Sequence, residues 1–492
     1  MASSRMKLLD YQLPHFDRAC QILAENFGYI DTAKTGSGKT YVAVALALKF
    51  GLNVFVIDIS KASDKWNDLC KQNGIKIIKN TYNTLSGIKD KLSHPYLTRK
   101  TNTTGGKTNN VSYFPTDELI KLIDEGTLFI FDEAHKVKNV STNNHQACRV
   151  IIETIIQRKG RSRYGLISAT LIDRINFAAG LCMLTGYMLY PDSINLGPRD
   201  AKMFSLKLFI DNCSAVNPQA TQKAIGSTNI IDDNYNKLCV SLLSEVITPR
   251  IRISYKAENN NPNFSKEVMT CFCTPSVPEE KELLKKAVDN FVKSTTYTKE
   301  GKVIIDTNAL SNLELCKAKM FVRKAKEIIL LNEKSKVVIF VNYVIPILNV
   351  IEQELAEFRV MSMFLHGEVP EKERKKVVNC FQNDPRYRII ISQVGVGGIS
   401  IDLDDTKGDS PRYAIMSPGY SIISMQQALG RTNRADTKSK VTTYVVYSDD
   451  PRERKILDSA AAKEAVIKSL SPENVNEGGD FIGELDTISL TI

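Results

Sequence analysis

The sequence lacks any apolar run that could cross a membrane. Its longest apolar stretches, such as residues 41–48 (YVAVALAL), fall well short of the roughly 20 residues that a bilayer requires. The N-terminus has no apolar segment followed by a small-residue cleavage site, so no secretory signal is predicted. We therefore expect a soluble, intracellular protein with no membrane partner, in the cytoplasm or the nucleus.

Cysteine, histidine and tryptophan are too few or too dispersed to form a recognisable cluster. Of ten cysteines, only Cys271 and Cys273 lie close together, and the five histidines are scattered along the chain. Without a signal peptide, reduced and mostly buried cysteines are the better interpretation, and no zinc site is visible. The single tryptophan, Trp66, suits a buried core position and a nucleic-acid surface equally well.

The net charge of the chain does not identify the kind of partner that it binds. The chain has 65 Lys and Arg against 55 Asp and Glu, a formal net charge of +10 over 492 residues. A polyanion partner would use such an excess to neutralise phosphates, but a solubilising surface explains it as well.

Short apolar segments alternate with amphipathic helical stretches, a pattern typical of α/β domains with buried parallel sheets. We predict a first domain over residues 1–185, a mostly helical insert over 186–330, a second α/β domain over 331–470 and an acidic, flexible tail over 471–492. The polar segment 98–112 (TRKTNTTGGKTNNVS) is predicted to be a mobile loop. Strands are expected at residues 29–33, 53–60, 127–133, 164–170, 336–343, 388–393, 413–418 and 442–448.

The stretch AKTGSGKT, residues 33–40, has the composition of a phosphate-binding loop. Gly36 and Gly38 allow a tight turn in which successive backbone N–H groups point at phosphate oxygens. A helix starting near Lys39 would add the partial positive charge of its N-terminus. Lys39 would reach the β- and γ-phosphates of the nucleotide, and the Thr40 hydroxyl would ligate magnesium.

A hydrolytic P-loop needs a second magnesium anchor and a group that orients the attacking water. Asp132 and Glu133 follow the apolar run LFIF, at the strand end where ligands of parallel sheets bind. An isolated Asp-Glu pair after a strand is usually a turn, but downstream of a P-loop it favours catalysis. We expect Asp132 to hold magnesium and Glu133 to act as the general base.

Together, AKTGSGKT, DEAH (residues 132–135) and SAT (168–170) resemble motifs I, II and III of superfamily-2 helicases and translocases. DEAHKVKN is most similar to the DEAH-x-x-K-N form of Swi/Snf-type translocases on double-stranded DNA. The resemblance implies two RecA-like domains, ATP and magnesium as cofactors, and coupling roles for His135, Ser168 and Thr170. It gives the adenine-reading role to Gln12, for which a surface helix residue is the alternative. The remaining ATP-binding residues that it implies are Lys34, Thr35, Gly36, Ser37, Gly38, Lys39 and Thr40.

The second half resembles the remaining motifs. QQALGRTNR fits motif VI with Gln427, Gly430, Arg431 and Arg434. A spacing of three predicts both arginines on one helix face, from which they would stabilise charge on the γ-phosphate. The alternative is an arginine-rich helix end on the surface.

Residues 392–401 (SQVGVGGISI) resemble motif V of strawberry-notch-type proteins and of related phage and viral helicases. Residues 364–374 resemble the helicase signature that follows motif IV. In the first half, residues 56–66 (VIDISKASDKW) and 80–85 (NTYNTL) fall where the Swi/Snf-type group has motif Ia and a following nucleic-acid contact strand. The nucleic-acid contacts that the resemblance implies are Ser60, Lys61, Thr81, His366, Gly367 and Ser392.

The leading hypothesis is an ATP-driven motor that tracks on double-stranded DNA, in viral transcription or genome handling, with a protein partner that supplies specificity. An RNA helicase is the rival, since grip on a phosphate backbone carries little sequence information. A different class of protein is a non-catalytic nucleic-acid-binding scaffold. Such a scaffold would not need the catalytic candidates, which are all present: Lys39, Asp132, Glu133, Arg431 and Arg434. A small-molecule kinase would not need motif VI. Strand separation requires a wedge, and no segment of the sequence identifies one.

Overall fold

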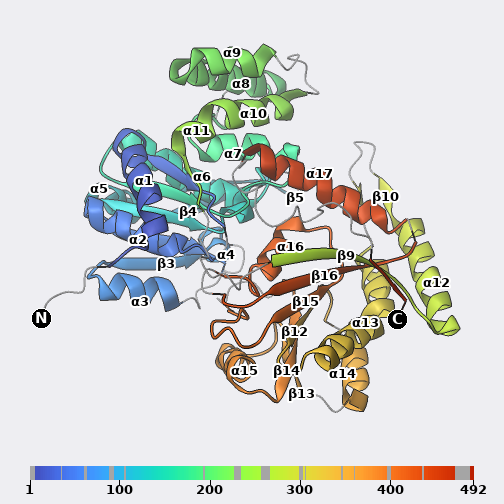
Figure 1. The fold of residues 1–492 in the computed structure, drawn as a ribbon. Coiled ribbons are helices and arrows are strands. Elements are labelled where there is room, and N and C mark those ends of the chain that lie inside the picture. The colour runs from blue at the N-terminus through green and yellow to red at the C-terminus, as the bar shows by residue number, and fades with distance from the viewer. Residues whose placement is uncertain are drawn as a thin grey trace, which may run out of the picture. The chain divides into compact units, whose positions relative to one another are not determined.

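Two parallel α/β sheets organise the computed structural model, each in its own compact unit (Figure 1). The first unit comprises residues 1–257 and 465–475, and the second comprises 258–464 and 476–492. All eight predicted strands are present, and the predicted fold class of two parallel-sheet α/β domains is confirmed. The structure describes residues 6–34, 36–59, 64–87, 94–104, 107–191, 194, 196–226, 234–255, 266–297, 303–304, 306–344, 347–358, 361–395, 401–434, 437–450, 452–470 and 488–491.

The first sheet has six strands, and every neighbouring pair is parallel. Helices cover both faces, so its central strands are continuous apolar runs rather than alternating ones. In sheet order the strands are β3 (Ile77–Thr81), β2 (Asn53–Asp58), β6 (Thr127–Asp132), β7 (Arg163–Ile167), β1 (Gly28–Asp31) and β8 (Arg252–Ile253).

Local capping defines several helices of this unit. The hydroxyls of Thr116 and Thr142 accept the backbone N–H groups of residues three positions later. One helix ends at Gly51, whose left-handed conformation suits glycine. The elements of this part of the chain are η1 (Asp10–Gln12), α1 (Leu13–Glu25), α2 (Lys39–Phe50), α3 (Asp64–Gln72), α4 (Tyr82–Leu85), α5 (Asp117–Glu125), η2 (Ala134–Val137) and α6 (Asn143–Arg158).

The segment that we expected as a helical insert is mostly helical but divides between the units after Ala257. Its N-terminal helices extend the core of the first unit, whereas β9 (Lys266–Thr274) pairs with a strand of the second sheet over eight residues. The helices around and within it are η3 (Ile175–Phe177), α7 (Ala178–Leu184), α8 (Pro198–Val216), α9 (Pro218–Gly226), α10 (Tyr235–Leu242), the π-helix η6 (Leu243–Ile247), α11 (Thr248–Ile251), α12 (Pro278–Ser294) and α13 (Thr307–Leu331).

The second sheet has seven parallel strands. Their order is β13 (Met361–Leu365), β14 (Tyr387–Gln393), β12 (Lys336–Val341), β15 (Arg412–Met416), β16 (Val441–Ser448), β9 and β17 (Ile488–Thr491). Apolar residues of α12, α13 and α14 (Ile347–Phe358) form a core with alternate residues of the central strands. The other helices are α15 (Glu371–Asn383), α16 (Ile422–Leu429) and α17 (Arg454–Leu470).

Several features differ from expectation. We did not predict β17, which lies in the segment expected to be a flexible tail; residues 471–487 and 492 lie outside the described part of the chain. Two further short strands, β10 (Thr296–Tyr297) and β11 (Val303–Ile304), form a small antiparallel ladder. The loop predicted over 98–112 is wrong, because β4 (Leu97–Thr104) and β5 (Lys107–Pro115) pair as an antiparallel hairpin.

The nine cysteines that the structure describes are all free, as predicted. Within the described ranges, no helix combines the length and apolar character needed to cross a bilayer.

Candidate nucleotide and nucleic-acid site

Most candidate residues of the first unit lie at the carboxyl ends of four neighbouring strands: β2, β6, β7 and β1. In the register of the sheet, Asp31 and Asp132 both pair with Ile167, and Ser168 follows directly. Ile57 pairs with Phe131, so Asp58 and Asp132 leave the sheet side by side. This edge is where parallel α/β sheets bind their ligands.

The P-loop follows β1 and has the backbone geometry that its glycines predict. Gly36 and Gly38 have φ values of 86° and 85°, in the region that favours glycine, and Gly38 precedes the first residue of α2. The Lys39 ammonium donates to the backbone oxygens of Ala33 (2.8 Å) and Lys34 (3.2 Å). The loop thus places a cation and a helix N-terminus together. Ser37 is buried, Thr40 is half-buried, and Thr35 lies outside the described residues.

Asp31 is a member of this site that the sequence did not single out. Its side chain is fully buried, and Oδ1 accepts the backbone N–H of Ala33 at 2.9 Å. Burial raises the pKa of Asp31 to about 6, although the charge of Lys39 and the bond from Ala33 act in the opposite direction. The carboxyl group therefore holds the first residue of the P-loop.

Gln12 is packed against the P-loop rather than lying on the surface. Its side chain is 2% exposed, and Nε2 donates to the Ser37 backbone oxygen at 2.9 Å. A Cβ atom at Gly38 would come within 2.3 Å of the same Nε2, so the residue after Ser37 must be very small. The alternative of a surface helix residue is wrong, because η1 turns Gln12 inward.

Asp132 lies in a set of contacts that links three segments of the chain. Oδ2 accepts the indole N–H of Trp66 at 3.0 Å, and the Asp132 backbone oxygen accepts the Tyr82 hydroxyl at 2.7 Å. Trp66 is 2% exposed, so it is a core residue that also contacts the candidate magnesium anchor. No sequence motif signalled this contact, because it depends on how α3 packs.

The carboxylates at this edge perturb one another. Burial raises the pKa of Asp132 to about 7, and the charges of Asp58 and Glu133 add to this effect, while Trp66 and Lys39 oppose it. Burial likewise raises the pKa of Asp58 to about 6. The sequence did not single out Asp58, although it occupies the end of a predicted apolar strand.

Glu133 has an unusual backbone for a residue with a side chain, with φ 54° and ψ 49°. Such a left-handed conformation is strained outside glycine and often occurs at functional sites. It directs the carboxylate to His135, with 3.2 Å between Oε2 and Nδ1. Burial alone would raise the pKa of Glu133, but the hydrogen bond and charge of His135, with Lys39 and Lys136, lower it.

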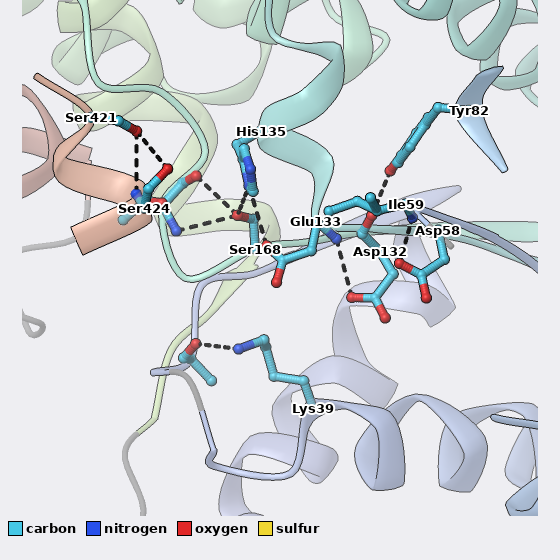
Figure 2. Close-up of polar contacts among 12 residues, drawn as sticks. Lys39, Asp58, Ile59, Tyr82, Asp132, Glu133, His135, Ser168, Ser421 and Ser424 are labelled. Carbon is cyan, nitrogen blue, oxygen red and sulfur yellow. Dashed lines mark hydrogen bonds and ion pairs between the residues drawn. The ribbon is translucent and has the colours of Figure 1, made fainter. Parts of the chain in front are cut away.

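A polar chain leads from Glu133 to the loop after β7 (Figure 2). His135 Nδ1 lies 3.2 Å from Ser168 Oγ, and Ser168 Oγ donates to the Thr170 backbone oxygen at 2.9 Å. These three side chains are at most 7% exposed. Lys138 forms an ion pair with Asp173 and attaches the same two segments a second time. The three motifs resembling I, II and III thus meet in one unit.

The arginines of the second unit do not share a helix face, so that prediction is wrong. Helix α16 ends at Leu429 with Gly430 as its C-terminal cap, and Arg431 and Arg434 follow in a turn and a loop. Arg434 forms an ion pair with Asp402 (2.9 Å). Arg431 is buried, and its backbone oxygen accepts the N–H of Leu403. Gln427 lies half-buried on α16.

Of the six nucleic-acid candidates, three lie together at the carboxyl ends of β13 and β14. Leu365, just before His366, pairs with Ser392, and the Gly367 N–H points at Gln393 Oε1 (3.4 Å). Among the described residues, neither His366 Nδ1 nor Ser392 Oγ has a hydrogen-bond partner, although both atoms are buried.

The other three nucleic-acid candidates belong to the first unit. Thr81 ends β3, and its hydroxyl caps α4 by accepting the Thr84 N–H at 3.1 Å. Ser60 and Lys61 lie outside the residues that the structure describes.

Two family models match the chain: "Type III restriction enzyme, res subunit" over residues 5–159 and "Helicase conserved C-terminal domain" over 320–436. The putative ATP-dependent RNA helicase L364 of Acanthamoeba polyphaga mimivirus is 25% identical over 483 residues, 96% of this chain and 86% of that protein. The human DNA excision repair protein ERCC-6-like is 28% identical over 131 residues, 26% of this chain but only 10% of that protein. The solved Sulfolobus solfataricus SWI2/SNF2 ATPase core in complex with dsDNA covers 99% of both chains at 18% identity, with a TM-score of 0.32.

Proposed function

We propose, for a chain that belongs to the superfamily-2 helicase and translocase ATPases, a motor that hydrolyses ATP to move along double-stranded DNA. The observation that carries the proposal is the meeting of Lys39, Asp132 and Glu133 at one sheet edge, joined through His135 to Ser168. A site that only binds nucleotide would not require an acidic pair connected to a separate polar loop.

In this proposal the P-loop binds the phosphates of ATP through its backbone N–H groups, the N-terminus of α2 and the Lys39 ammonium. Gln12 hydrogen-bonds the adenine from its position behind Ser37. Thr40 and Asp132 would hold magnesium, since their hard oxygen atoms suit that ion. Magnesium, when bound, neutralises phosphate charge. The acidic side chains Asp58, Asp132 and Glu133 supply the negative field that attracts a divalent cation.

Glu133 is the group that orients and deprotonates the attacking water. Its lowered pKa keeps the carboxylate ionised at neutral pH, as a proton acceptor requires. The contact with His135 fixes the carboxylate, so the strained backbone and the imidazole together hold it in one direction.

His135, Ser168 and Thr170 couple hydrolysis to movement. A change in charge at Glu133 alters the His135 contact, and Ser168 passes the change to the loop after β7. We propose that Arg431 and Arg434, with Gln427, stabilise charge on the γ-phosphate. The ion pair of Arg434 with Asp402 would hold that side chain ready.

Duplex DNA is the proposed substrate because several relatives are named DNA repair proteins, among them ERCC-6-like and the rad5 protein of Neurospora crassa. RNA is the second candidate, because the mimivirus relative is named an RNA helicase. That relative also supports a role in viral transcription or genome handling. We propose that Ser60, Lys61, Thr81, His366, Gly367 and Ser392 contact the polynucleotide and that a protein partner supplies specificity.

Steady-state ATP hydrolysis by the full chain tests the proposal, measured alone and with duplex DNA, single-stranded DNA or RNA at low salt. Duplex DNA should stimulate turnover most, and Lys39→Ala should abolish it in every condition because the phosphates lose their cation. Stimulation by RNA alone would replace the DNA motor with an RNA helicase. ATP turnover that is the same with and without every polynucleotide would contradict the proposal, as would turnover retained in Lys39→Ala.

A further inference from the structure

The β4–β5 hairpin has a net positive charge that the ATPase site does not use, because it lacks acidic residues. Its two strands include Arg99, Lys100 and Lys107 and no Asp or Glu. The hairpin belongs to neither large sheet, since its two strands pair only with each other among the described strands. An acid-free hairpin of this length is an electrostatic feature that a polyanion recognises.

One face of the hairpin anchors it to the first unit. Leu97 and Tyr113 are buried, and the Tyr113 hydroxyl donates to the Ser86 backbone oxygen at 2.6 Å. Arg99, which pairs with Tyr113 across the strands, donates to the Gly87 backbone oxygen at 3.3 Å. These contacts fix the base of the hairpin to the turn after α4, just beyond the candidate nucleic-acid residue Thr81.

The opposite face is open to solvent and has a different composition. Thr98 pairs with Phe114, and Lys100 pairs with Ser112, so these four side chains alternate with the anchoring residues. Phe114 is 44% exposed, and Lys100 is exposed beside it, with its Nζ 5.0 Å from the centre of the ring. An apolar partner would need more than one ring, whereas a single ring with an adjacent ammonium matches one base and one phosphate.

We propose that the outer face of this hairpin binds an unpaired segment of a polynucleotide. The Phe114 ring stacks on one base, and the Lys100 ammonium binds the neighbouring phosphate. Stacking on a side chain requires a base with a free face, and in a duplex both faces are covered by the neighbouring base pairs. The inference rests on the proposed function, which identifies the ligand as a polynucleotide. It assigns to the hairpin the binding of a strand that is separated from its complement.

The hairpin is also joined to the nucleotide site through α4. At one end of this four-residue helix, Tyr82 donates to the Asp132 backbone oxygen, and just past the other end Ser86 accepts from Tyr113. Polynucleotide binding at the hairpin and a displacement of the Asp132 backbone would therefore both act on α4.

Fluorescence anisotropy of the full chain tests the proposal with labelled oligothymidylate and oligouridylate of about 20 nucleotides and with a blunt duplex. The variant Lys100→Ala/Phe114→Ala should bind both single strands about 10- to 100-fold more weakly, because it loses one stacked base and one phosphate contact. Binding of the duplex should change less than about threefold. The two single strands show whether DNA or RNA is preferred.

The matched control is Phe204→Ala/Lys207→Ala on α8, which removes an equally exposed phenylalanine (45%) and an exposed lysine from another surface of the same unit. It should bind single strands like the wild type. Phe114→Tyr keeps the ring and should retain most of the affinity, which separates stacking from misfolding.

Single-strand affinity equal to wild type in the hairpin variant would overturn the inference, as would a wild-type protein that binds only duplex. The proposed function survives both results. A wild-type protein that binds no polynucleotide would instead remove the proposed function itself.

Discussion

Acidification should destabilise the first unit through His145, a buried imidazole in the first turn of α6. Its side chain is fully buried, and Nδ1 lies 2.6 Å from the Val137 backbone oxygen, so Nδ1 carries the proton and donates. Nε2 has no hydrogen-bond partner within the described part of the chain. Burial therefore lowers the pKa of His145 from 6.5 to about 4. Val137 ends η2, the element that carries His135, so the contact also holds this segment in place.

The magnitude follows from proton linkage. The folded state resists protonation until about pH 4, whereas the unfolded chain takes up the proton near pH 6.5, so stability is lost as pH falls through this window. The loss amounts to about 2 kcal/mol at pH 5 and roughly 3 kcal/mol at most. Asp31 and Asp58 act in the opposite direction, because their raised pKa values give stability that is lost as pH rises through about 6. Only a comparison of variant with wild type isolates His145.

The variant His145→Gln retains an N–H donor for the Val137 oxygen but cannot titrate. Urea unfolding of the full chain, followed by Trp66 fluorescence, reports on the first unit because Trp66 is the only tryptophan and lies in that core. The free energy of unfolding of wild type minus variant should fall by about 2 kcal/mol between pH 8 and pH 5. A difference that stays constant over this range would refute the burial argument. A cavity cost of the substitution would appear equally at both pH values.

Four substitutions test the proposed ATPase site. Glu133→Gln should bind ATP normally but reduce turnover by at least about 100-fold; wild-type hydrolysis would remove Glu133 as the base. Trp66→Phe deletes the N–H donor to Asp132, a charge-assisted bond of about 1.5–3 kcal/mol, and should raise the magnesium concentration for half-maximal ATPase about tenfold. An unchanged magnesium titration would contradict this role. Arg431→Ala and Arg434→Ala should each lower kcat about 1,000-fold with little change in nucleotide affinity, and normal turnover in both would exclude them from the site.

The strands that sequence reasoning found are those whose own residues form a clear apolar run. Central strands such as β2 and β12 are continuous runs of branched apolar residues because helices cover both of their faces. The strands that it missed carry weaker signals. Strand β13 is mostly half-buried at the edge of its sheet, and β8 has only two residues. For these strands, the neighbouring strand rather than the local composition determines the structure.

The hairpin illustrates a composition that misled us. Thr, Asn and Gly are frequent in loops, but threonine also has high β-propensity, and Gly105-Gly106 is a dipeptide that commonly connects two hairpin strands. The anchoring residues Leu97 and Tyr113 alternate with exposed ones, which is the period-two pattern of a strand with one buried face.

The residues of the candidate site also divide into those that the sequence identified and those that only the packing revealed. Short motifs gave Lys39, Asp132 and Glu133, because their chemistry depends on neighbours in the chain. The contacts of Trp66 and Asp58 could not be read from the sequence, since both depend on how strands and helices of the first unit pack. The helical placement of the two arginines failed for a local reason: Gly430 ends α16 before either arginine is reached.

The contacts of α4 offer the first unit a physical means of linking ATP hydrolysis to the proposed binding of an unpaired polynucleotide strand. Tyr82 and Ser86 are both buried, so neither end of α4 can shift without breaking a hydrogen bond or moving its partner. The partner at one end is the backbone of Asp132, and at the other it is Tyr113 of the hairpin. A packed element with two such attachments transmits a displacement instead of absorbing it. Binding of an unpaired strand at Phe114 would therefore bias the position of Asp132, and by reciprocity the state of the nucleotide site would bias the affinity for the strand.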